Sequence, residues 1–496
     1  MSVPVSLLSL LLSTALVQDL PPLPKGLSGD SDKEQKQEQE KSASSPSGLP
    51  SLPTGLGKTD EKDKPVQDKA LPSLPSGLGS APSSTDTPDA EKSAPNWFME
   101  HFTGFVEARG GIRLQEDETQ DGASIGEIRT QLQTELSAGP ALFNLTADFL
   151  FDPVANDYAI DLEKGRGFID LREANMVLRP SDFLDLKIGR QIATWGTGDL
   201  VFINDMFPKD YNSFFIGRDD EYLKAPSDAI RASFFSDIVN VDLVYTPRFD
   251  ADRYIDGTRI SYLNPLTGMI AGEDMVIDPV RPDGWFDDDE IAIRFSRNAG
   301  TFELAAYTYD GYWKSPAGFN TQGRFIFPEL AVYGASIRGP FLGGIGNAEV
   351  GYYDSKDDPD GDNPFLPNSQ ARFLVGYERE AMTNLTIGLQ YYTEQTLDHD
   401  ALAAALPMGA EEPDEIRHVI TTRLTKLAYN QNLTLSLFIF YSPNQEDGYL
   451  RARASYKLDD NWLVDGGVNV FYGEPQAFFG QFEDNTNIYA GLRRSF

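Results

Sequence analysis

From Phe102 to the end of the chain, short segments follow one another in which apolar and polar side chains alternate. The clearest spans residues 433–441, where the apolar residues at odd positions share one face. Successive side chains of a strand point to opposite faces, so a period of two predicts β-strands with one apolar face. We count about 18 such segments, with 16 as the lower bound.

The connections between these segments alternate between short and long. The short ones lie at about residues 138–140, 180–182, 236–237, 298–300, 339–343, 381–384, 429–432 and 459–461. The long ones include about residues 194–227, 247–289, 310–327, 354–368 and 394–415. Transmembrane barrels have short turns at one end and long loops at the other, whereas a soluble sandwich gives no reason for this alternation. We therefore predict an all-β, antiparallel up-and-down transmembrane β-barrel of about 18 strands over residues 97–496.

The polar faces of the predicted strands carry charges near their centres, at Arg294, Arg451, Arg453 and Asp465. Such a face, opposite a continuous aliphatic one, suits a barrel with lipid outside and water inside, and these residues should line the lumen. By the same parity several aromatic residues point inward, namely Phe438, Phe440, Phe471, Tyr307, Tyr309 and Tyr392. They could form a track for sugars or apolar solutes, or fill space.

Composition excludes several classes of protein. Only 40% of the residues are hydrophobic, and no apolar run reaches the roughly 18 residues of a membrane-spanning helix. The formal charge of -34 argues against a nucleic-acid partner. The three histidines, His101, His399 and His418, have no catalytic partner in sequence, so we expect no enzyme activity.

The first 96 residues differ from the rest. Residues 1–17 contain the apolar stretch 3–17, which predicts a signal peptide, although no Lys or Arg precedes it; a short buried helix is the alternative. Residues 18–96 are rich in Pro, Ser, Gly, Lys and Glu, a composition that predicts a disordered tail in the periplasm.

Within this tail the phrase Leu-Pro-x-Leu-Pro-x-Gly-Leu occurs three times. Paired Leu-Pro steps favour polyproline II, so each copy could dock a periplasmic or inner-membrane partner, and three copies would raise avidity. The alternative is a low-complexity linker. The candidate docking residues are Leu20, Leu23, Leu27, Leu49, Leu52, Leu56, Leu71, Leu74 and Leu78.

The chain ends in a strand, residues 487–496, that stops on an aromatic residue. Ile488, Ala490, Leu492 and Arg494 share one face of it, and the other face is polar. This pattern resembles the terminal signature by which bacterial outer-membrane proteins reach their insertion machinery, with Phe496 as the assembly signal. It implies the outer membrane of a Gram-negative bacterium, with membrane lipid and that machinery as partners.

At residues 189–199 a regular strand breaks into glycines and a long charged loop. Gly189-Arg190-Gln191, then Trp195-Gly196 and the stretch from Asn204 to Asp210, resemble large outer-membrane channels of the alginate-export and related uncharacterised porin-like families. The resemblance implies a loop folded inward that narrows the pore with charges of both signs. The candidate constriction residues are Arg190, Asp199, Asp205, Lys209, Asp210, Arg218, Asp219, Asp220, Glu221 and Lys224.

Strict alternation would turn Arg190 toward lipid, so we predict a bulge at Gly189 that returns it to the lumen. The alternative places Arg190 at the headgroup boundary and makes the loop an exposed cap.

Two acidic runs, residues 357–363 and 287–290, could hold Ca²⁺ in external loops, although neither has the complete spacing of a calcium loop. We expect no other cofactor.

These patterns predict a channel, monomeric or homotrimeric, for diffusion of small or moderately sized solutes through a pore narrowed by a charged loop. The alternative is the outer-membrane component of an envelope-spanning export or lipid-transport assembly that docks a partner through its N-terminal repeats.

Overall fold

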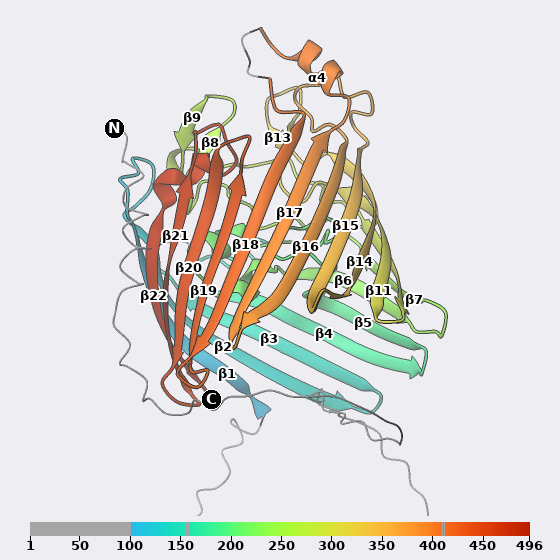
Figure 1. Cartoon of the computed structure of the whole chain (residues 1–496), viewed down its shortest axis with the longest axis vertical. Coiled ribbons are helices and arrows are strands. Elements are labelled where there is room, and N and C mark those ends of the chain that lie inside the picture. The colour runs from blue at the N-terminus through green and yellow to red at the C-terminus, as the bar shows by residue number, and fades with distance from the viewer. Residues whose placement is uncertain (1–100, 155–157, 409, 411) are drawn as a thin grey trace, which may run out of the picture. The chain divides into compact units, whose positions relative to one another are not determined.

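The computed structural model describes residues 101–154, 158–408, 410 and 412–496. Eighteen strands form one antiparallel sheet in which each strand pairs with its neighbours in chain order, and β22 pairs with β1 to close the barrel (Figure 1). The strands of the barrel are β1 (Thr103–Arg113), β2 (Ala123–Ala138), β3 (Ala141–Phe151), β4 (Ile169–Ser181), β5 (Leu184–Gln191), β6 (Ser227–Phe234), β7 (Asn240–Thr246), β10 (Glu290–Ala299), β11 (Phe302–Tyr312), β14 (Glu329–Phe341), β15 (Gly344–Ser355), β16 (Gln370–Met382), β17 (Leu385–Thr396), β18 (Ile416–Ala428), β19 (Leu433–Ser442), β20 (Asp447–Lys457), β21 (Trp462–Tyr472) and β22 (Asn487–Ser495). The predicted fold is confirmed.

The remaining elements lie in the connections. They are the hairpins β8 (Tyr262–Asn264) with β9 (Met269–Ala271) and β12 (Gly318–Phe319) with β13 (Phe325–Ile326), the helices α3 (Tyr211–Phe215) and α4 (His399–Ala405), and the 3₁₀ turns η1 (Asp220–Leu223), η2 (Glu273–Met275) and η3 (Gly480–Asn485).

Short turns and longer loops alternate around the barrel, as the sequence predicted. The turn between β14 and β15 has only Leu342 and Gly343, and both have positive φ, which a two-residue turn of type I′ requires. At the other end, residues 192–226 join β5 to β6 and residues 247–289 join β7 to β10. One four-residue connection, 443–446, also lies at the long-loop end.

The two faces of the wall differ as the period of two predicted. On β22, Ile488 and Leu492 are exposed on the outer face, while Tyr489 and Asn487 are buried on the lumen face. The guanidinium of Arg494, the departure from the apolar pattern, lies over the Trp462 ring at 5.6 Å. The strand pairs with both β21 and β1, so the last strand closes the barrel.

No helix in the described part of the chain is long and apolar enough to cross a membrane.

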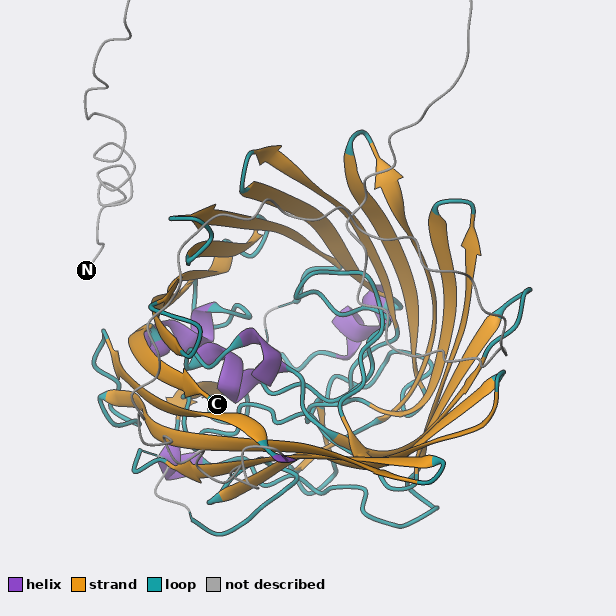
Figure 2. Cartoon of the chain, turned by 90° about the horizontal axis from the view of Figure 1, so that it is seen from below, coloured by secondary structure: helices purple, strands orange, loops and turns teal. Residues whose placement is uncertain are grey.

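Loop segments fold into the interior of the barrel (Figure 2). We call residues 192–226 the inward loop. Its first half, with Trp195 and Ile203, packs on the lumen face from β6 to β18, and its second half, with Phe214 and Phe215, packs against β19 to β21. The inward-pointing aromatic residues Tyr307, Tyr309, Tyr392, Phe438 and Phe471 are buried in these two clusters, and Phe440 packs against them. Their packing agrees with the second of the two alternatives, that they fill space, although Phe438 also lines a cavity.

Candidate channel constriction

The inward loop is first held by β15 and β17. The Glu349 carboxylate accepts hydrogen bonds from the backbone N–H groups of Thr197 and Gly198 and from the Asn204 side chain. On β17, the Gln390 side chain accepts from the backbone N–H of Asp199 at 2.7 Å and donates to its carbonyl at 2.8 Å. A side-chain amide that pairs in both directions fixes the backbone as a neighbouring strand would. The loop therefore has a defined path at this point.

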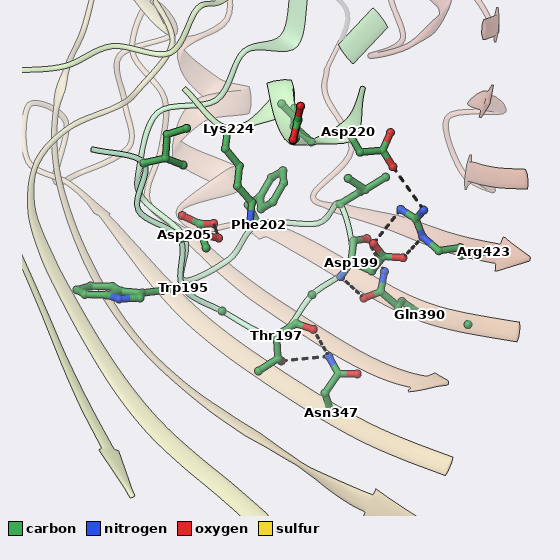
Figure 3. Close-up of a pocket in the computed structure, with 18 of the residues that line it drawn as sticks. Trp195, Thr197, Asp199, Phe202, Asp205, Asp220, Lys224, Asn347, Gln390 and Arg423 are labelled. Atoms are coloured by element: carbon green, nitrogen blue, oxygen red, sulfur yellow. Dashed lines mark hydrogen bonds and ion pairs between the residues drawn. The ribbon is translucent and has the colours of Figure 1, made fainter. Parts of the chain in front are cut away.

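Ion pairs then join the loop to strands on the C-terminal side of the barrel. Asp199 pairs with Arg423 of β18, at 2.9 Å between Oδ1 and Nη2. Asp220 pairs with Arg451 of β20 at 3.0 Å. Asp219 lies between Arg453 of β20 and Arg493 of β22, at 2.5 and 2.8 Å (Figure 3 shows Asp199, Asp220 and Arg423). Charge-assisted bonds of this kind are stronger than neutral ones, so they hold the loop across the lumen.

Side chains of the barrel wall bind the centre of the inward loop through its backbone carbonyl groups. Asp210 caps the N-terminus of α3, and its carboxylate accepts from the Ser213 N–H at 2.7 Å. Side chains from the wall donate to carbonyl groups in the last turn of the helix and just after it: Arg451 to Phe214 and Arg218, Asn469 and Asn487 to Phe215, and Arg109 to Gly217. Arg109 is itself held by both oxygens of Asp465 at 2.9 and 3.0 Å.

The end of the loop reaches the N-terminal strands. Arg218 pairs with Glu127 of β2. The Tyr222 ring lies between the guanidinium groups of Arg129 and Arg172, at 4.1 and 4.7 Å, in cation–π geometry. The inward loop is thus held from β15 round to β4, on both sides of the closing seam.

A cavity of about 870 Å³ remains between the loop and the wall. Of the predicted constriction residues, Asp199, Asp205, Asp220, Glu221 and Lys224 line it. A neighbouring cavity of about 410 Å³ is lined by Asp219, Phe438, Arg451 and Arg453, together with other residues. Arg294 lies on the lumen face elsewhere, paired with Glu303. The charges at the loop are of both signs, as the resemblance implied.

Other predicted residues lie deeper in the loop structure. Lys209 is buried and pairs with Asp205 at 3.0 Å. Asp210 is buried and receives Arg253 at 3.3 Å. Arg253 comes from the loop of residues 247–289, and both oxygens of Asp170 on β4 bind it at 2.7 and 2.9 Å. This second loop therefore fastens onto the first, a contact that the sequence did not predict.

The prediction for Arg190 was wrong. From Leu186 to Arg190, β5 pairs with β4 and β6 without a bulge. Arg190 pairs with Asp228 opposite it at 2.8 Å, on the outward parity of Ile188 and Ile230. The irregularity lies on β4 instead, where Arg172 has no partner in the register with β3. Arg190 therefore lies outside the constriction, although the loop is not the exposed cap that the alternative described.

Asp250, at the start of the loop 247–289, has a pH-dependent role in stability. Burial and the nearby Glu290 carboxylate raise the pKa of Asp250 to about 6. The carboxylate accepts from Ser227 Oγ at 2.9 Å and the Asp228 N–H at 2.8 Å.

The folded state favours protonated Asp250. The stabilisation of the folded protein that this protonated side chain provides is therefore complete below pH ~4 and is lost as the pH rises through about 6. We expect Asp250→Asn to remove a pH-dependent contribution of about 3 kcal/mol between those limits. Urea unfolding in detergent at about pH 4 and about pH 8, for both proteins, measures it. An identical pH slope in the two proteins would contradict the assignment.

The acidic runs have structural partners. Asp358 accepts from the N–H of Asn363 at 3.1 Å, Asp288 from the Tyr312 hydroxyl at 3.0 Å, and Asp289 from the Tyr245 hydroxyl at 2.7 Å. Across the described residues, no group of three or more His, Cys, Asp or Glu side chains could hold a metal ion. Calcium binding by these loops stays a prediction.

Two of the histidines have their own contacts. The ring of His418 bonds the Tyr391 hydroxyl at 2.8 Å, and that of His399 bonds the carbonyl of Pro413 at 2.7 Å.

No model of a known protein family matches this sequence, and no curated protein sequence does. Solved structures are similar in fold. OccK11 of Pseudomonas aeruginosa is 8% identical, with 80% of this chain and 95% of that chain covered at a TM-score of 0.46. OccAB1 of Acinetobacter baumannii is 9% identical, with 82% and 99% covered and a TM-score of 0.46. Wzi of Escherichia coli, an outer-membrane protein involved in group 1 capsule assembly and a carbohydrate-binding β-barrel, is 10% identical, with 80% and 85% covered and a TM-score of 0.45.

The resemblance to the alginate-export family therefore stays a prediction. The signal peptide, the tail and its three repeats lie outside the described residues.

Proposed function

We propose that this protein is an outer-membrane channel of a Gram-negative bacterium, through which small solutes diffuse past the inward loop. The observation that carries the proposal is the loop itself, held across the lumen by Asp199, Asp219 and Asp220 while a cavity of about 870 Å³ stays open beside it. A structure built only to anchor or to adhere needs no polar cavity inside its barrel. Fixed charges at a narrow point are how pores set selectivity.

Incorporation of the full chain into planar lipid bilayers tests this function. We expect discrete conductance steps, smaller than an empty barrel of 18 strands would give, because the loop occupies much of the lumen. Folded protein, verified by its mobility on a gel without heating, that inserts and conducts no ions would contradict the proposal.

The second candidate is a station in an export or lipid-transport assembly. It is favoured by one observation, the Leu-Pro phrase repeated with a constant core and variable spacers in residues 18–96. On this proposal the tail is periplasmic, on the side of the short turns. A pull-down with the tail as bait would identify the partner, and a protein that competes with the free repeat peptide is the result that favours it.

A further inference from the structure

The cavity beside the inward loop is lined by ten charged side chains, of which six are already bound to protein groups. Arg172 donates to the carbonyl of Lys224, and the carboxylates and Arg423 are held in ion pairs. The six are Arg172, Glu173, Asp199, Asp205, Asp220 and Arg423.

The other four, Glu221, Lys224, Arg338 and Glu378, form no ion pair and no side-chain hydrogen bond with any residue that the structure describes. Two are cations and two are carboxylates, so their charges cancel. Solute in the cavity therefore meets free groups of both signs.

These four groups come from two sides of the cavity. Glu221 and Lys224 are on the inward loop, within and directly after η1. Arg338 on β14 and Glu378 on β16 are on the wall, flanking β15, where their registered neighbours are Asn347 and Ile345. Two strand spacings and an offset of two residues along the strand separate the wall pair by roughly 12 Å. Each side thus presents one cation and one carboxylate.

Trp195 also lines this cavity, although the residue is only 9% exposed. Its indole Nε1–H has no hydrogen-bond acceptor among the described residues, but the nitrogen atom is itself buried. A solute in the cavity therefore meets the edge of the Trp195 ring and not this N–H group. Figure 3 shows Trp195 and Lys224 bordering the cavity from the inward loop.

We propose that this cavity admits small dipolar solutes, those with an ammonium and a carboxylate group on one short skeleton. Lys224 and Arg338 face the carboxylate, and Glu221 and Glu378 face the ammonium group. A singly charged solute meets as many like charges as opposite ones, whereas a dipolar solute is attracted at both ends. This inference rests on the proposed channel function.

Swelling of liposomes that carry the full-length protein tests it with two solutes of similar size. γ-Aminobutyrate is dipolar and erythritol is uncharged, and neither needs a counter-ion to enter. We expect γ-aminobutyrate to enter several-fold faster through the wild-type protein, and Glu221→Gln with Lys224→Met to reduce that ratio to about one. Lys457→Met is the matched control, because Lys457 is a cation of the neighbouring cavity only.

The outcomes separate the two proposals. Equal entry of both solutes through the wild-type protein would overturn the dipolar class and leave the channel in place. A preference that persists in the double variant, or that Lys457→Met abolishes as well, would overturn the assignment to these residues. Entry of neither solute would overturn the channel function itself.

Discussion

Replacement of residues 194–224 by a short Gly-Ser linker should raise the single-channel conductance several-fold. The linker can be short because Gln191 and Ser227, at the two ends of the loop, are paired across β5 and β6. Removing the loop widens the lumen where the loop crosses it, and the arginines that held it become hydrated. Planar-bilayer recording measures the change.

A second variant tests the same proposal in case the deletion variant does not fold. Asp219→Asn with Asp220→Asn keeps the loop but removes two of its ion-paired carboxylates, so we expect larger current fluctuations at the wild-type mean conductance or above. Arg324→Met is the control, because its pair with Asp278 is exposed and neither residue lines the two cavities. Unchanged conductance in the deletion variant would mean that the inward loop does not limit the pore.

Arg253→Met should cost about 3–5 kcal/mol of stability. Arg253 is buried and binds both oxygens of Asp170 as well as Asp210, so its removal leaves two carboxylates buried without their partner. Urea titration in detergent, followed by tryptophan fluorescence, gives the free energy of unfolding.

Adding Asp170→Asn to this variant should recover part of the loss, because an amide costs less to bury unpaired than a carboxylate does. The exposed pair of Arg324 and Asp278 provides the comparison, and Arg324→Met should change stability by less than about 1 kcal/mol. A loss of that small size for Arg253→Met would show that the loop of residues 247–289 is not fastened through this residue.

The sequence predicted the wall of this barrel well, because each strand carries its own signal. The alternation from Leu433 to Tyr441 assigns its two faces without any knowledge of β18 or β20. Three of the two-residue turns, 139–140, 300–301 and 342–343, contain a glycine. The lumen positions of Arg451, Arg453 and Asp465 followed from parity alone.

The interior was less predictable, because its contacts join distant parts of the chain. Nothing near Asp199 in sequence indicates Arg423, and the anchor Glu349 resembles any other polar residue on a lumen face. The error at Arg190 is of a different kind. The predicted bulge at Gly189 is absent, and the extra residue in this region is Arg172 on β4, in its pairing with β3.

The ties between Asp199 and Arg423, and between Asp219 and Arg453, span 224 and 234 residues. Contacts this distant in sequence form late, after the entropy of closing the intervening chain has been overcome. The ion pairs of the inward loop with β18 and β20 therefore cannot form before these C-terminal strands have folded. We expect the ordering of the loop to accompany the pairing of β22 with β1, because Asp219 also pairs with Arg493 of β22.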